Sequence, residues 1–430
     1  MKKKCMVICS VILAFAMTAC GAAPAASTPT SGAQVISGAS TIPEKPEKLT
    51  LVSVANATGL WDYVKEWEEK TGIRVEISEM DLGALQTQAT TYFAAQSPDI
   101  DLVYTYVALT AEWGSAGYLE EISSYLTEEE WSQFSQGALN CVRYKEGVYG
   151  LPYFYSIRLF YNNMDLLREK GFEEPPKNWD EFMKIAKACT DPSKDQYGVL
   201  MGLGNNEAVM IAYQDICALY DQTIISADNE LLFTNEKGIA ALEDFVELQT
   251  SGVLDPASYG VSSGPDRRAR FLTGNVAMAW EWAPLMAEIK AEGPFEGAIS
   301  LTPEIEVSGA LTGSEGLAVS KFSNNKYWAM DLLKYLTSDD VQTRYAKTSG
   351  WFPVKTKVFE DEEILKVSAS MQAAKTQAEH PTFRWAAPYY SEAMPTLADN
   401  ILQALNEKVP AQQALETAAE KIEPIIRSYQ

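Results

Sequence analysis

The order of apolar periodicities along the chain is the feature that most restricts its fold. Residues 49–54 form a short β-rich run, and residues 60–71 carry apolar side chains at the spacing of one helix face. Residues 73–77 alternate as a strand, a helical stretch continues to Gln96, and residues 100–104 form another β-rich run. This strand–helix–strand order predicts an α/β fold with mainly parallel sheets covered by helices.

A helix with a clear start is predicted after residue 177. Asn178 can cap it, with Glu181 three residues later, and Phe182, Ile185 and Cys189 would form its inner face. Helical spacing returns in later segments around residues 239–246, 328–336, 397–405 and 414–425.

The first 20 residues predict an export signal that ends in a lipid-modified cysteine. Three lysines precede an uncharged run, residues 5–19, which is short for a membrane span, and small residues precede Cys20. The pattern resembles the bacterial lipobox, with Met17 where leucine is usual. We expect removal of residues 1–19 and lipidation of Cys20 on the outer face of the cytoplasmic membrane. Residues 20–48 would be a flexible tether; the alternative is an ordinary cleaved signal and a free protein.

Composition argues against several classes of function. The formal net charge of −23 would repel a nucleic-acid backbone. His380 is the only histidine, so zinc sites and Ser-His-Asp catalysis would be hard to build. Beyond the signal and Cys20, the cysteines are Cys141, Cys189 and Cys217, an odd number without a CxxC pair. We therefore expect no metal, no cofactor, no nucleic-acid partner and no catalytic residues.

Several segments resemble a known family of transport proteins. The most extended are KEGVYGLP at 145–152, YNNMDLL at 161–167 and PPKNWDEF at 175–182. Shorter agreements follow the same order at 71–75, 98–100, 271–278, 316–321, 337–342 and 350–353. Together they resemble the extracellular solute-binding proteins of ABC importers, in the sugar-binding group typified by maltose-binding protein.

The resemblance implies a type II periplasmic-binding-protein-like fold, in which two α/β lobes enclose a ligand cleft and the chain crosses a hinge three times. It implies lobes of 49–157 with 304–350 and of 158–303 with 351–430, with crossings near 158–161, 299–303 and 350–354. The implied partners are a small carbohydrate and the permease subunits of an ABC transporter. The chain would be a monomer that touches the membrane only through its lipid anchor.

Aromatic rings can cover the C–H faces of a sugar, while carboxylates and backbone groups satisfy its hydroxyls. By the resemblance, the candidate ligand-binding residues are Trp61, Tyr104, Tyr106, Tyr153, Tyr155, Trp280, Glu281, Trp282, Gly313, Ser314, Glu315 and Trp351. Core packing is the competing interpretation for the aromatic residues. Neighbouring residues of a strand face opposite sides, so Trp280, Glu281 and Trp282 should not all point into the core. This favours the segment 280–282 as part of the ligand site. Arg384 and Trp385 are weaker candidates for the rim of the cleft.

Two other functions remain open at this point. Acidic and aromatic side chains such as Glu281 and Glu315 would also suit a polyamine. A secreted hydrolase is less favoured: residues 260–264 fit G-x-S-x-G with His380 downstream, but a turn-like segment precedes them where the motif needs a strand. The arginines at 267, 268 and 270 are expected to face solvent.

Overall fold

The computed structural model describes residues 42–54, 59–226 and 228–429, so the expected signal, Cys20 and most of the tether lie outside the described residues. Lys45–Gln430 form one unit. Two separate sheets organise this unit, and a two-stranded hairpin stands apart from both. None of the helices in the described ranges is long and apolar enough to cross a membrane.

The first sheet is built mostly from the N-terminal part of the chain. Its strands are β1 (Lys48–Val54), β2 (Arg74–Met80), β3 (Leu102–Tyr106), β6 (Leu151–Ile157), β11 (Ala310–Val319) and β12 (Pro381–Phe383). They follow the order β12-β11-β3-β1-β2, and β6 also pairs with β11. β1 runs parallel to β2 and β3, whereas β11 runs antiparallel to β3 and β6.

The second sheet comes from the middle of the chain. Its strands are β7 (Leu159–Asn163), β8 (Tyr197–Leu200), β9 (Val276–Glu281) and β10 (Gly297–Ser300), in the order β10-β7-β9-β8. The separate hairpin joins β4 (Arg143–Tyr144) to β5 (Gly147–Val148). The α/β class is confirmed, but both sheets are mixed rather than mainly parallel, because strands such as β11 and β7 run against their neighbours.

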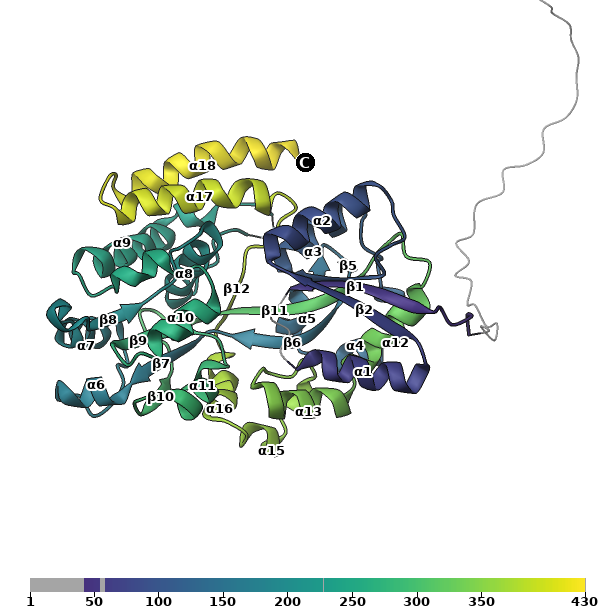
Figure 1. Ribbon diagram of the computed structural model, residues 1–430. Coiled ribbons are helices and arrows are strands. Elements are labelled where there is room, and N and C mark those ends of the chain that lie inside the picture. The colour runs from purple at the N-terminus through teal and green to yellow at the C-terminus, as the bar shows by residue number, and fades with distance from the viewer. Residues whose placement is uncertain (1–41, 55–58, 227, 430) are drawn as a thin grey trace, which may run out of the picture. The chain divides into compact units, whose positions relative to one another are not determined.

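Helices cover both sheets (Figure 1). Those packed on or beside the first sheet are α1 (Leu60–Thr71), α2 (Leu82–Ala94), α3 (Val107–Ser115), α5 (Gln136–Asn140) and α12 (Lys326–Leu336). Those packed on the second are α6 (Met164–Glu169), α7 (Trp179–Cys189), α10 (Gly264–Phe271), α11 (Leu285–Glu292) and α16 (Ala369–Gln377).

The remaining helices pack mainly on other helices. α8 (Asn206–Leu219) contacts β11, α9 (Glu236–Thr250) and α17 (Tyr390–Leu405). α18 (Ala411–Ser428) packs on α9 and α17. α13 (Asp339–Ser349) lies against α12, α14 (Thr356–Phe359) and α15 (Glu362–Leu365). The short α4 spans Glu128–Ser132.

The predicted start and inner face of α7 are confirmed. The Asn178 side chain accepts a hydrogen bond from the backbone N–H of Glu181 at 2.9 Å, which satisfies a donor left free at the helix start. Phe182, Ile185 and Cys189 are all buried. The Glu181 carboxylate accepts from the Lys177 N–H rather than from Asn178, so the reciprocal half of a capping box is replaced by a bond one residue earlier.

The chain passes from the first sheet to the second after β6 and returns to the first after β10. Arg158 alone separates β6 from β7, and residues 301–309 separate β10 from β11. Residues 351–355, however, stay with the first sheet, since the Tyr155 N–H donates to the Phe352 carbonyl at 2.8 Å. α16 is the next helix that packs on the second sheet. These contacts place the third passage after α15, later than the expected 350–354, and β12 then returns to pair with β11.

Candidate functional site

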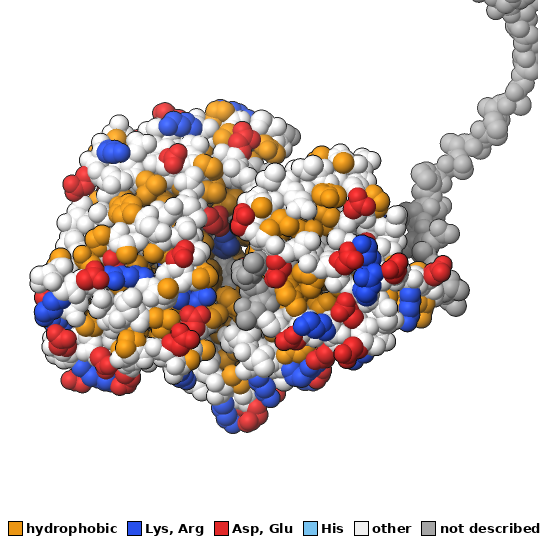
Figure 2. Space-filling model, viewed as in Figure 1, with side chains coloured by type: hydrophobic (Ala, Val, Ile, Leu, Met, Phe, Trp, Pro, Cys, Tyr) orange, Lys and Arg blue, Asp and Glu red, His pale blue; other side chains and the backbone are white. Residues whose placement is uncertain are grey.

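Side chains from both sheets meet around Gly313 on β11. A Cβ atom at this glycine would lie 3.4 Å from Arg384 Cδ, 3.4 Å from Ser156 Oγ and 4.0 Å from Trp282 Cη2. Ser156 belongs to β6 of the first sheet, whereas Trp282 directly follows β9 of the second. Figure 2 shows a hollow between the two halves of the molecule, with acidic and basic side chains facing each other near its upper end. Ligands of open α/β sheets bind beyond the carboxyl ends of the strands. In this protein Tyr106 is the last residue of β3, and Trp282 follows the last residue of β9.

The first group of side chains, here called the tyrosine–carboxylate cluster, consists of Glu315, Tyr104 and Tyr153. The Tyr153 hydroxyl donates to Glu315 Oε2 at 3.1 Å, and the Tyr104 hydroxyl also hydrogen-bonds this carboxylate. Glu315 is the one residue of β11 that is not fully buried. Burial disfavours the charged form and raises its pKa to about 7, although hydrogen bonds from the two tyrosine hydroxyls act in the opposite direction.

The second group, here called the Arg384 cluster, joins Arg384 to Tyr106, Glu207 and Tyr390. The Arg384 guanidinium lies over the Tyr106 ring, with 4.9 Å from Cζ to the ring centroid, and pairs with the Glu207 carboxylate of α8. The Tyr390 hydroxyl donates to the other oxygen of Glu207 at 2.5 Å. Arg384 thus connects strand β3 of the first sheet to helix α8.

A buried charge network lies behind the cluster around Gly313. Arg158 donates hydrogen bonds to Asp215 from Nε and Nη2, and the shorter one joins Nη2 to Oδ2 at 2.7 Å. Its Nη1 lies 3.7 Å from Glu281 Oε1. Arg267 Nε donates to Glu281 Oε2 at 2.7 Å. Two arginines and two carboxylates therefore balance in charge. Burial alone would raise the pKa of Glu281, but the charges of Arg267 and Arg158 outweigh this effect and lower it.

This network corrects one expectation and changes how another residue is interpreted. Arg267 was expected to face solvent, yet it is 5% exposed and bonded to Glu281. Its neighbours Arg268 and Arg270 also pair with carboxylates, at Glu288 and Asp255. Sequence periodicity could not reveal these partners because they lie on other elements of the fold.

Of the segment 280–282, only Trp282 is partly exposed. Trp280 is 1% exposed and packs between Phe160 and Phe182, with ring centroids 4.6 and 5.4 Å away. β9 is an interior strand covered on both faces, so neighbouring residues of opposite orientation are both buried. Trp282 lies over Arg158, with 5.0 Å from Cζ to the ring centroid.

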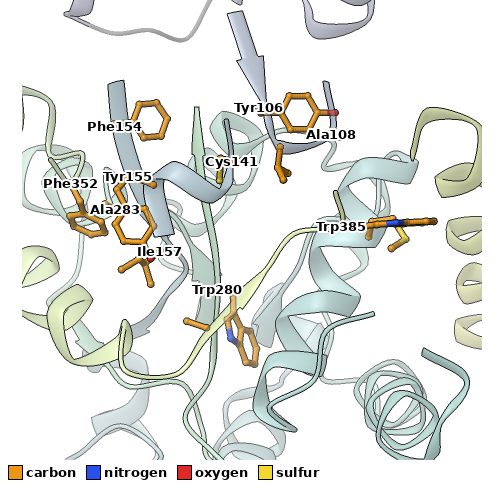
Figure 3. Close-up of a cluster of buried hydrophobic side chains, with 14 of the residues drawn as sticks. Tyr106, Ala108, Cys141, Phe154, Tyr155, Ile157, Trp280, Ala283, Phe352 and Trp385 are labelled. Atoms are coloured by element: carbon orange, nitrogen blue, oxygen red, sulfur yellow. The ribbon is translucent and has the colours of Figure 1, made fainter. Parts of the chain in front are cut away.

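The other candidates have varied surroundings. Tyr155 is buried beside Phe352 (Figure 3), and the Ser314 hydroxyl donates to the Ala138 carbonyl. Trp351 is partly buried and stacks on Phe154, with centroids 4.2 Å apart and planes at 18°. Trp61, at the start of α1, donates from Nε1 to Glu79 at 2.8 Å.

Trp385 is buried against Tyr389 and Tyr390. Glu207 and Tyr390 were not predicted as site residues; Tyr390 lies six positions after Arg384, whereas Glu207 is 177 residues away from it.

The G-x-S-x-G segment does not have the geometry of a hydrolase elbow. A 3-10 helix, Pro256–Gly260, precedes Ser262 where the motif needs a strand. Ser263 caps α10 by accepting from the Asp266 N–H, and His380 is exposed. Within residues 42–54, 59–226 and 228–429, no group of three or more His, Cys, Asp or Glu side chains could hold a metal ion.

Comparisons with known proteins agree with this architecture. The family model for bacterial extracellular solute-binding proteins matches residues 62–378. A probable ABC transporter-binding protein of Deinococcus radiodurans is 24% identical over 317 residues, which cover 70% of this chain and 73% of that protein. The galactooligosaccharide-binding protein of Bacillus subtilis is 24% identical over 444 residues, covering 98% of this chain and 96% of that protein.

A solved structure has the same fold. Maltose-bound MalE3 of T. maritima superposes with a TM-score of 0.78 at 22% identity, over 88% of this chain and 99% of the other. The type II fold of two α/β halves is thereby confirmed, and since the family model covers most of the chain, this protein belongs to the bacterial extracellular solute-binding proteins.

Proposed function

We propose that this protein is the solute-binding component of an ABC importer and that it captures a mono- or oligosaccharide between its two sheets. The family and the names of its relatives in B. subtilis and T. maritima support a carbohydrate. The observation that carries the proposal is the meeting of Trp282, Arg384 and Ser156 at Gly313, which offers an aromatic ring and polar groups from both sheets to one solute.

The mechanism is reversible capture without a change in any covalent bond. A sugar that touches Trp282 on one side and the tyrosine–carboxylate cluster on the other would interact better with a closed than with an open arrangement. Such a ligand shifts the open–closed equilibrium only by its difference in affinity for the two states. The closed, liganded form would then be the one that the permease recognises.

Titration calorimetry on a soluble form that begins at residue 21 tests this proposal. A panel of neutral mono- and oligosaccharides should contain at least one that binds with a Kd in the micromolar range or below. Trp282→Ala should weaken that binding at least tenfold, because stacking on the ring is lost. Trp179→Ala, on α7, is the matched control and should leave the Kd unchanged.

Two results would contradict the proposal. One is the absence of binding by every saccharide in the panel, and the other is the appearance of cleavage products when the bound oligosaccharide is recovered and analysed by chromatography.

We also propose that the mature protein is a monomer held at the membrane by lipid on Cys20. The support is the lipobox-like pattern in the sequence. Cys20→Ser should move the protein from the membrane fraction to the soluble fraction and abolish incorporation of labelled fatty acid. Equal partition of the variant and the natural protein would favour an ordinary cleaved signal.

A further inference from the structure

The carboxylate of Glu315 differs from the other acids of the site in its partners. Asp215 and Glu281 are each paired with an arginine, and Glu207 is paired with Arg384. Glu315 is held by the hydroxyls of Tyr104 and Tyr153 instead, and no described lysine or arginine nitrogen lies within 4 Å of it. A carboxylate withdrawn from water without a cation is costly, so either a proton or a cation must compensate it.

Aromatic residues lie on both strands that flank Glu315. Glu315 is the register partner of Tyr106 on β3 and of Phe154 on β6. Phe154 in turn stacks on the partly exposed Trp351. Glu315 therefore has Tyr104 and Tyr106 on the strand to one side, β3, and Tyr153 and Phe154 on the strand to the other side, β6. The faces of aromatic rings attract ammonium groups, and a carboxylate next to these rings adds a charged hydrogen-bond acceptor.

We propose that the solute is an amino sugar or an oligosaccharide that contains one, and that its protonated amino group binds at Glu315 within the tyrosine–carboxylate cluster. This inference rests on the proposed capture of a carbohydrate and specifies its chemistry. The sugar ring would extend toward Gly313 and Trp282, two residues along β11 and across to the second sheet, while the ammonium group supplies the countercharge that the described surroundings of Glu315 lack.

Binding should be coupled to the release of a proton. The other titratable or charged groups near Glu315 are the hydroxyls of Tyr104, Tyr106, Tyr153 and Tyr345, the thiol of Cys141 and the guanidinium of Arg384, which is paired with Glu207. Burial raises the pKa of each of these hydroxyls and of the thiol away from neutrality. At pH 6 an alkylamine is already charged. Burial raises the pKa of Glu315 to about 7, so its carboxyl group is mainly protonated at this pH. An ammonium group that binds there as an ion pair therefore displaces this proton.

Calorimetry with matched ligands tests the inference. Oligosaccharides of glucosamine and their N-acetylated counterparts of equal length differ in the charge of the nitrogen. The natural protein should bind the amine form at least tenfold more tightly. Glu315→Gln should reduce this preference at least tenfold and change the Kd for the N-acetylated form less than threefold. Glu174→Gln, at an exposed acid on the second half, is the control for net charge and should keep the preference.

A second measurement needs no variant. Titration of the natural protein at pH 6 in two buffers of different ionisation enthalpy should show release of most of one proton with the amine ligand and none with the N-acetylated ligand. Equal affinity for the two ligands, or a preference that survives in Glu315→Gln, would overturn the inference while the capture of carbohydrate stands. Failure of both ligands and of all neutral saccharides to bind would overturn the proposed function as well.

Discussion

Replacing Glu315 by glutamine should remove a pH dependence of stability that this one carboxyl group imposes. Its pKa of about 7 in the folded protein lies above the ordinary value of 4.5 for glutamate. The folded state therefore holds the proton more tightly than the unfolded state between these two values. Stability from this group is fully present below pH 4.5 and is lost as the pH rises to about 7.

The size of the effect follows from the difference between the two pKa values. Each pKa unit corresponds to about 1.4 kcal/mol, so the natural protein would lose up to about 3 kcal/mol relative to the variant between pH 4.5 and 8. Because Glu315 is partly exposed, solvent screening reduces this figure, and we expect about 1 to 2 kcal/mol. Glutamine has nearly the same shape and keeps an acceptor for the two tyrosine hydroxyls.

Urea denaturation followed by tryptophan fluorescence at pH 5, 6, 7 and 8 measures the effect. The difference in the free energy of unfolding, variant minus natural protein, should increase steadily across this range and level off near pH 8. Glu174→Gln should show a constant difference, because that acid is exposed and paired only with Lys177. A flat or decreasing difference for Glu315→Gln would refute the assignment of a carboxyl group without a compensating cation.

Three further substitutions and one control variant test other parts of the fold by the same unfolding measurement. Glu281→Gln should cost about 3 to 5 kcal/mol, because it leaves two buried arginines with one carboxylate; a loss below about 1 kcal/mol would argue against a closed charge network. Asn178→Ala should cost about 1 kcal/mol through the lost cap of α7, and no change would show that water replaces it. Gly350→Ala should cost about 1 kcal/mol because this residue has φ 76°, whereas Gly260→Ala, without a positive φ or a close neighbour, should be neutral; equal effects would exclude backbone strain as the cause.

Local structure was predictable because its signals lie close together in the sequence. Asn178 and the residues one and two turns later define the start and inner face of α7, and both predictions are confirmed. The limits of β3 were less accurate, since Ile100 precedes the strand and Tyr106 ends it. The order of strands and helices also gave the fold class correctly.

The candidate site was harder to predict because its partners are distant in sequence. Glu281 was selected as a polar group for the ligand, but the structure shows that Arg267 and the Trp282 N–H already occupy its carboxylate. Glu207 is 177 residues from Arg384, so no local pattern joins them. Burial of Trp280 depends on coverage of β9 from both faces, which strand alternation alone does not specify.

The position of β11 in the first sheet has a consequence for how the molecule acquires its structure. This strand joins β3 to β6, yet its residues follow those of β3 by about 200 positions. Until β11 is in place, β3 and β6 present unpaired backbone edges that invite association with other chains. A fragment that stops before residue 310 should therefore aggregate rather than fold, and formation of the native sheet should be slow because it depends on the closure of a very long loop.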